Sequence, residues 1–194
     1  MNYLTRISLG RSQAASMRLA DAYAWHQKLW EAFPDRDGEK RNFLFRIDDA
    51  GQDFRVLLLS GITPTPPQWG HWSTKSVAES FLQHPNYRFQ IRANPTMRRS
   101  KDGKRLGIYQ ENRLREWICR KAQINGFAIL EESLTVGAPI DEFFRKNGKR
   151  GQHVSVDFRG LLSVTEYSAF AKAFQTGIGS AKAFGFGMLM LEPI

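Results

Sequence analysis

The sequence has few of the residues that build disulfide bonds and metal sites. Its 194 residues include one cysteine, Cys119, and four histidines. A single cysteine excludes a disulfide framework and a cysteine-rich zinc site, and the histidines have neither H-x3-H nor H-E-x-x-H spacing. We therefore expect no metal ion and no cofactor. A reducing, cytoplasmic location fits a chain this poor in cysteine.

Long apolar runs are missing as well. The N-terminal stretch MNYLTRISLG is interrupted by Arg6, and no long apolar segment follows it. We expect neither a signal peptide nor a membrane span.

The acidic residues do not suggest a two-metal nuclease site. Several aspartates stand near expected turns, where turn formation and capping account for them better: Asp35, Asp37, Asp48, Asp49 and Asp53. If the protein is a nuclease, we expect it to work without a metal ion.

Positive charge is what the sequence has in excess. It contains 28 Lys and Arg residues against 19 Asp and Glu residues, a net charge of +9. This surplus points to a polyanionic partner, nucleic acid before membrane. Apolar residues make up 42% of the chain and aromatic residues 12%, so we expect a packed globular protein.

Residue patterns in the first half predict strands, a helix and a loop. Strands are expected over 3–9, 43–47 and 54–60, and a helix over 17–33 that ends at Pro34. Residues 62–86, rich in proline, are expected to be loop with one short helix near 74–82. In NYRFQIRAN, core-facing Tyr87, Phe89, Ile91 and Ala93 alternate with Arg88, Gln90 and Arg92. This strand is expected to complete a β-α-β-β-α-β unit.

The second half predicts a similar set. We expect a helix over 111–123, a strand over 127–136, a hairpin over 143–164, a helix capped by Thr165 and a closing strand over 186–193. The basic run MRRSKDGKR (97–105) is expected to be a mobile loop or linker. The predicted fold class is α+β: two tandem ferredoxin-like, RRM-like domains with antiparallel sheets, at residues 1–97 and 98–194.

The stretch GIGSAKAFGFG (177–187) concentrates four glycines near the C-terminus. A dinucleotide-binding loop follows a strand and opens a helix, whereas this loop follows a helix and precedes a strand. A P-loop needs Gly-Lys-Ser/Thr, which is absent. The glycines therefore indicate positive φ angles or the close approach of another backbone, with Lys182 beside them. A tight helix-to-strand connection is the simpler alternative.

His26 falls inside the apolar arc of the first helix. On a helical projection this arc includes Ala22, Trp25, Leu29 and Phe33, with Tyr23 at its edge. One interpretation is a core histidine. The other is a general acid or base that lines a cleft, with Tyr23 orienting the same reacting group.

Basic residues form three groups. The first comprises Arg88 and Arg92 on one strand face, the second Arg98, Arg99, Lys101, Lys104 and Arg105, and the third Arg145, Lys146, Lys149 and Arg150 at the hairpin tip. Each group alone is typical of a solvated surface. Together, on a chain of this charge, they favour a surface that follows a nucleic-acid backbone through phosphate contacts. The absence of outward aromatic side chains on the strand over 86–94 favours a structured RNA over stacked single-stranded bases.

Four stretches carry a resemblance to a known family: AYAWHQKLWEAFPDR, FLFRI, RFQIRANP and GIGSAKAFGFG. The chain resembles the CasE-type CRISPR repeat-processing endoribonucleases of the type I-E Cascade complex. The last stretch is similar to that family's glycine signature, G-h-G, five residues, G-h-G, where h is hydrophobic. The resemblance runs from end to end and is weakest over 62–86 and 98–113.

The resemblance implies two ferredoxin-like domains that cleave CRISPR stem-loop RNA without metal. It implies attack by a 2′-hydroxyl group, leaving a 2′,3′-cyclic phosphate and a 5′-hydroxyl, with the guide RNA kept after a single turnover. It places the catalytic histidine at His26 and a tyrosine at Tyr23. It places the RNA-gripping hairpin at Lys146, Lys149 and Arg150. The partners implied are crRNA and other Cascade subunits, among them a backbone subunit of the Cas7 type.

RNA contacts are also expected at the C-terminal loop, through Gly177, Gly179, Lys182, Gly185 and Gly187. That loop could instead receive the catalytic helix of the other domain. Two further functions remain open from the sequence: a stem-loop RNA-binding protein that holds a guide RNA without cutting it, and a basic protein that binds DNA or membrane.

Overall fold

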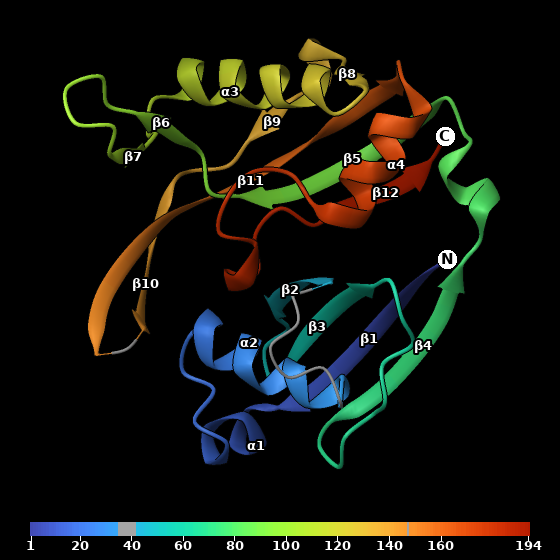
Figure 1. Ribbon diagram of the computed structural model, residues 1–194, viewed down its shortest axis with the longest axis vertical. Coiled ribbons are helices and arrows are strands. Elements are labelled where there is room, and N and C mark those ends of the chain that lie inside the picture. Colours follow the sequence, from blue (N-terminus) through green and yellow to red (C-terminus); the bar gives the residue numbers. More distant parts are fainter. Residues whose placement is uncertain (35–41, 147) are drawn as a thin grey trace.

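Two large antiparallel sheets and one two-stranded hairpin form the β-structure of the described residues. The computed structural model describes residues 1–34, 42–146 and 148–194. Figure 1 shows the second sheet above the first, with α1 and α2 at one end of the molecule and α3 at the other. The α+β class with antiparallel sheets, expected from the sequence, is confirmed.

The first sheet has the strand order β2-β3-β1-β4. It contains β1 (Asn2–Gly10), β2 (Phe43–Asp49), β3 (Asp53–Ser60) and β4 (His71–Val77). Its helices are α1 (Arg11–Ser16) and α2 (Ala22–Leu29), and α2 continues into the 3-10 turn η1 (Trp30–Ala32). Trp25 and Leu29 on α2 pack with Phe43, Phe45 and other buried side chains in one hydrophobic core. This amphipathic packing is why the periodic segment forms a helix.

The second sheet has the order β10-β11-β5-β12, and β8 and β9 also pair with β11. Its strands are β5 (Asn86–Ala93), β8 (Phe127–Ile129), β9 (Thr135–Val136), β10 (Ile140–Lys146), β11 (Lys149–Val164) and β12 (Leu189–Pro193). Helices α3 (Glu111–Ile124) and α4 (Tyr167–Thr176) pack on it around Tyr87, Ile91 and Phe158. The 3-10 turns are η2 (Glu79–Leu82), η3 (Glu131–Ser133) and η4 (Lys182–Phe184). The β10–β11 hairpin extends from this sheet toward α2 (Figure 1).

One expected strand pairing is wrong. The strand over 86–93 does not complete the first sheet, because β5 pairs with β11 and β12. The place beside β1 is taken by β4, in the segment expected to be loop with a short helix near 74–82, and only the 3-10 turn at Glu79–Leu82 is helical there. Its sequence, HWSTKSV, is mostly exposed and polar, so it lacks the alternation that marks a strand. The chain thus passes from the first sheet to the second between β4 and β5. This crossing lies upstream of the domain boundary expected between residues 97 and 98.

Three smaller expectations also need correction. The run over 97–105 is not a linker, because it forms a hairpin of β6 (Thr96–Arg98) and β7 (Arg105–Gly107) around the turn at Gly103. Glu166 rather than Thr165 caps α4, since its carboxylate accepts hydrogen bonds from the backbone of Ser168 and Ala169. The strand over 127–136 is divided into β8 and β9 by η3.

The alternation predicted for β5 is confirmed. Tyr87, Phe89, Ile91 and Ala93 are buried, and the side chains between them are less so. The expected helix over 17–33 is α2 with η1, and it begins later because Asp21 is the N-cap. Asp35 and Asp37 lie outside the described residues.

Candidate active site

The helix that carries Tyr23 and His26 starts at a carboxylate cap. The Oδ1 atom of Asp21 accepts a hydrogen bond from the backbone N of Ala24 at 2.8 Å. An aspartate at this position satisfies an otherwise unpaired N–H and suits the positive end of the helix dipole. The cap fixes where α2 begins, and so which side chains face β2.

His26 lies among aromatic rings and is 9% exposed. Its ring centroid is 5.7 Å from that of Phe43 and 6.1 Å from that of Phe45, both on β2. Trp30 and Tyr23 stand at 6.2 and 6.5 Å. The expectation that His26 is not a solvated surface residue is confirmed. Both ring nitrogens, Nδ1 and Nε2, are buried, so RNA can reach them only if neighbouring side chains move.

The glycine loop packs its main chain against β2. All four glycines have positive φ, between +77° and +86°. A Cβ atom on Gly177 would lie 2.8 Å from Leu44 Cδ2, and one on Gly185 would lie 3.3 Å from the Phe45 ring. Side chains there would hold the first sheet away from the loop. The loop is therefore more than a tight connection, because its glycines let the two sheets approach each other.

The same loop reaches the catalytic-helix candidate. Phe184 on η4 stacks with Tyr23 at a centroid distance of 6.0 Å. Gly187 N donates to Arg92 O at 2.7 Å, which ties the loop to β5. The helix of the first unit, one of the two approaches expected at this loop, contacts η4, whereas Gly177 and Gly185 face β2. Lys182 lies on η4, beside Phe184.

The β10–β11 hairpin stands beside α2. Phe144 on β10 contacts Phe184 at 4.3 Å and His153 at 4.6 Å between ring centroids. Burial lowers the pKa of His153 below its ordinary value. The Nδ1 atom of His153 is 3.2 Å from the side-chain nitrogen of Asn94. Aromatic contacts of Phe144, close to the tip, thus anchor the hairpin to η4.

At the hairpin tip, Arg145, Lys149 and Arg150 are exposed. The guanidinium carbon of Arg150 lies 4.2 Å from the centroid of the Phe143 ring. Such a contact holds a cation in place while leaving its polar edge accessible. The side chain of Lys146 lies outside the described part of the structure.

The other basic residues do not gather at this site. Arg88 is exposed and pairs with Glu192 at 2.7 Å. The second group, Arg98, Arg99, Lys101, Lys104 and Arg105, lies on the exposed β6–β7 hairpin, where Arg99 and Lys104 pair with Asp102. Figure 1 shows this hairpin at the α3 end of the molecule, apart from the β10–β11 hairpin.

Arg92 lies between the sheets, in an ion-pair network. Its Nη2 atom is 3.4 Å from Asp48 and 3.2 Å from Asp157. Arg46, 5% exposed, pairs with the same two carboxylates at 2.9 and 3.2 Å. The network joins β2 of the first sheet to β5 and β11 of the second, so Arg92 is already engaged within the protein.

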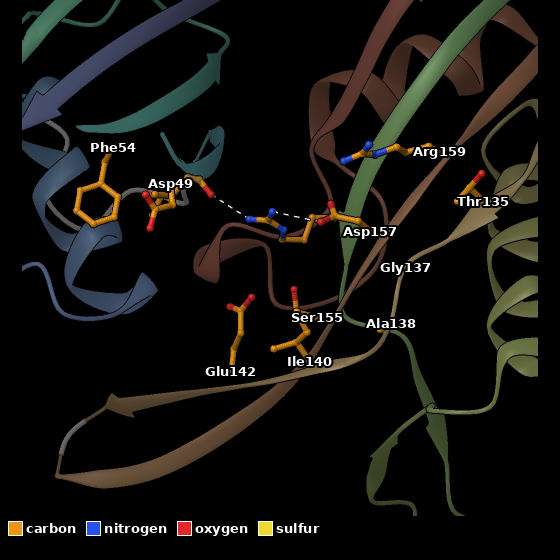
Figure 2. Close-up of a pocket in the computed structure, with 12 residues that line it drawn as sticks. Asp49, Phe54, Thr135, Gly137, Ala138, Ile140, Glu142, Ser155, Asp157 and Arg159 are labelled. Carbon is orange, nitrogen blue, oxygen red and sulfur yellow. Dashed lines mark hydrogen bonds and ion pairs between the residues drawn. The ribbon is translucent and has the colours of Figure 1, made fainter. Parts of the chain in front are cut away.

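A cavity opens next to this network. Figure 2 shows Asp49 and Phe54 on one side of it and Asp157, Arg159 and Thr135 on the other. Its lining carries charges of both signs, unlike a uniformly basic groove for an RNA backbone.

Sequence analysis missed Asp21, Phe144 and Phe184. Asp21 accepts from the backbone N of Arg145 at 3.1 Å, a contact between residues far apart in the chain. Its signal in the sequence was that of an N-cap. The two phenylalanines look like ordinary core residues, and no pattern separates them from others.

Within the described ranges, no group of three or more His, Cys, Asp or Glu side chains is arranged to hold a metal ion. None of the helices described is long and apolar enough to cross a membrane.

The fold and the site together define an α+β protein of two tandem ferredoxin-like units. A ring-enclosed histidine lies on α2, the helix that contacts both η4 and the basic hairpin of the second unit. Residues 2–193 match the family model described as "CRISPR associated protein", so the chain belongs to that family. The family expected from the sequence is confirmed.

Known relatives match the whole chain. It is 30% identical to the CRISPR system Cascade subunit CasE of Escherichia coli K12, over 99% of this chain and 100% of the relative. It is 29% identical to the CRISPR-associated endoribonuclease Cse3 of Thermus thermophilus, over 98% and 100%. The structure of Thermus thermophilus Cse3 bound to an RNA representing a pre-cleavage complex has a TM-score of 0.85, at 25% identity over 99% of both chains.

Proposed function

We propose that this protein is an endoribonuclease that cleaves CRISPR repeat stem-loop RNA into mature guide RNA and remains bound to it as a Cascade subunit. The observation that carries this proposal is the match over 99% of both chains to Cse3 in a pre-cleavage RNA complex. The names of the relatives, an endoribonuclease and a Cascade subunit, support the same reaction and the same partners. We place the reaction in the cytoplasm.

The proposed chemistry needs two proton transfers and no metal ion. A base takes the proton of the 2′-hydroxyl group as its oxygen attacks the adjacent phosphorus atom. The bond from phosphorus to the 5′-oxygen breaks, and an acid protonates that oxygen. The products are a 2′,3′-cyclic phosphate and a 5′-hydroxyl end. His26 moves one of these protons, a contribution of about 10²- to 10⁴-fold in rate.

Support for His26 comes from its setting. It lies on a capped helix against β2, and the glycine loop closes on the same helix through Phe184 and Tyr23. Rings on several sides hold the imidazole in one orientation, which is what a proton-transfer group requires. Tyr23, one turn earlier, orients the reacting group.

RNA binding is proposed for the β10–β11 hairpin. Its exposed tip, with Arg145, Lys149 and Arg150, projects beside α2 and suits phosphate contacts in an RNA stem. The β6–β7 hairpin, the glycine loop with Lys182, and Arg88 are proposed as further contacts. Arg92 is proposed to act indirectly, by keeping the two units together.

A second candidate is a stem-loop RNA-binding protein that does not cut. The observation in its favour is that His26 is 9% exposed and lies among four aromatic rings. A core histidine would be found in the same setting.

One experiment separates the two functions. The stem-loop repeat RNA is incubated in EDTA with wild type, His26→Ala and His26→Phe, and the product ends are analysed. We expect cyclic-phosphate product from wild type and a loss of about 10²- to 10⁴-fold in rate for both variants, with RNA affinity kept. His26→Phe preserves the ring packing, and His71→Ala, an exposed histidine on β4, is the control with wild-type activity. RNA bound tightly and left intact by wild type would establish the non-cutting function.

A further inference from the structure

The two oxygens of Asp21 serve two different elements. Oδ1 accepts from Ala24 N at 2.8 Å and caps α2. Oδ2 accepts from Arg145 N at 3.1 Å, at the tip end of β10. Asp21 and Arg145 are 124 residues apart in the chain. One carboxylate therefore joins the helix of Tyr23 and His26 to the hairpin.

The position of β10 in its sheet explains why this contact is available. β10 is an edge strand, paired on one side with β11. Backbone N–H groups on the free side of an edge strand need a partner from elsewhere. The N-terminus of α2 also carries unpaired N–H groups and a partial positive charge. A carboxylate placed between them satisfies both.

The contact lies next to the residues proposed to grip RNA. In the hairpin, Arg145 is opposite Arg150, and the following pair is Lys146 and Lys149. On the other side of Asp21, Tyr23 and His26 lie within the eight-residue helix α2. Asp21 thus lies between the basic residues of the hairpin tip and the proposed proton-transfer groups on α2.

An aromatic contact runs parallel to this polar one. Phe144, which precedes Arg145, meets Phe184 at 4.3 Å, and Phe184 stacks with Tyr23 at 6.0 Å. Ring contacts bury area and tolerate sliding, whereas a hydrogen bond to a charged acceptor fixes direction and register. The aromatic contact holds the hairpin near α2, and Asp21 sets where along β10 the two meet.

We infer that Asp21 is a positioning residue, which holds the hairpin in register with α2 so that RNA gripped at the tip reaches Tyr23 and His26 correctly aligned. The inference rests on the proposed function. Misalignment of reacting groups by about 1 Å can cost about 10²-fold in rate. Loss of the Asp21 link therefore lowers the rate of cleavage more than it lowers RNA affinity.

The first test is Asp21→Asn. Asparagine caps a helix as well as aspartate does, but its amide group would face the Arg145 N–H with a donor instead of an acceptor. Cleavage is measured in single turnover with protein in excess, and affinity with RNA carrying a 2′-deoxy nucleotide at the cut site. We expect the rate to fall by about 10- to 100-fold and the dissociation constant to change by less than about threefold.

Glu166→Gln is the matched control. It makes the same carboxylate-to-amide change at the cap of α4. We expect wild-type cleavage from it. If Asp21→Asn cleaves as fast as this control, the inference is overturned while the proposed function stands. An equal loss of rate and affinity would also overturn it. If wild type does not cleave, the proposed function fails and this inference fails with it.

A second pair of variants changes the hairpin side of the contact. It tests the inference if Asp21→Asn lowers the melting temperature too far for its cleavage rate to be interpreted. Arg145→Pro removes both the side chain and the N–H, whereas Arg145→Ala removes the side chain alone. Proline is tolerated on edge strands. We expect Arg145→Pro to cleave at least about tenfold more slowly than Arg145→Ala, and Asp21→Asn to add nothing further to Arg145→Pro. Equal rates for the proline and alanine variants would contradict the proposed link.

Discussion

At the scale of single residues, neighbours in space decide what a side chain does. The helical projection placed His26 on an apolar arc, and the structure agrees. The projection could not identify Phe43 and Phe45, the neighbours of His26 on β2. Arg92 is the opposite case: its outward position was predicted, but its partners, Asp48 and Asp157, lie on other strands.

His153 leads to a prediction about pH and stability. Its pKa is lowered in the folded protein, so the unfolded chain binds a proton at a higher pH than the folded one does. The free energy of unfolding should therefore fall as the pH drops below about 6.5. His153→Phe, which suits the surrounding rings of Phe144, Phe184 and Phe186, should lose less stability over that range. Urea denaturation at pH 8 and pH 5.5 measures this loss of unfolding free energy in both proteins.

His71→Phe, on the exposed face of β4, is the control for that experiment and should follow wild type. The same loss of stability in His153→Phe as in wild type would show that another group causes it.

At the scale of elements, the hairpin was well predicted. Basic residues around Gly148 marked a tip, and β10 and β11 turn there. The sequence also indicated the glycine loop as a place of close approach, although its partner, β2, belongs to the other sheet.

The hairpin tip carries the prediction for RNA binding. Lys149→Ala combined with Arg150→Ala should weaken binding and reduce the slope of log K against log salt by about two, because two phosphate contacts are lost. The control is Arg55→Ala with Lys75→Ala, exposed residues on β3 and β4 that make the same change in charge. Binding is measured by titration at several salt concentrations. A slope as steep as that of wild type would contradict the assignment of the tip.

The glycine loop carries a prediction for stability. Gly177→Ala must accept a φ of +77° and a Cβ atom 2.8 Å from Leu44 and 3.0 Å from Gly187 O. Gly51→Ala must accept a φ of +84° with nothing within 4 Å of the Cβ atom, so it isolates the backbone strain. We expect Gly177→Ala to cost about 1–3 kcal/mol more than Gly51→Ala, from overpacking. Chemical denaturation measures the free energy of unfolding of both variants. Equal losses would mean that packing against Leu44 adds nothing to the backbone strain.

At the scale of the whole molecule, the ion-pair network holds two sheets together. Arg46 is nearly buried between Asp48 and Asp157. Arg46→Ala removes a positive charge that neutralises two partly buried carboxylates. We expect it to lower the free energy of unfolding by about 3 kcal/mol. Arg88→Ala breaks an exposed pair with Glu192 and should cost less than about 1 kcal/mol. Similar losses in the two variants, measured by denaturation, would rule out a special role for the network.

The sequence by itself determined the class and much of the site: strands and helices in the order of two ferredoxin-like units, His26 on the buried side of a helix, a basic hairpin tip and a glycine loop that something must approach. Only the tertiary structure decided that β5 belongs to the second sheet, that β4 completes the first, and that Asp21 meets Arg145. The reason is that periodicity depends on local geometry and tells which face of an element is buried. The hydrogen bonds between strands and the contacts between distant side chains depend on how the chain closes over many residues, and no local pattern specifies that neighbour.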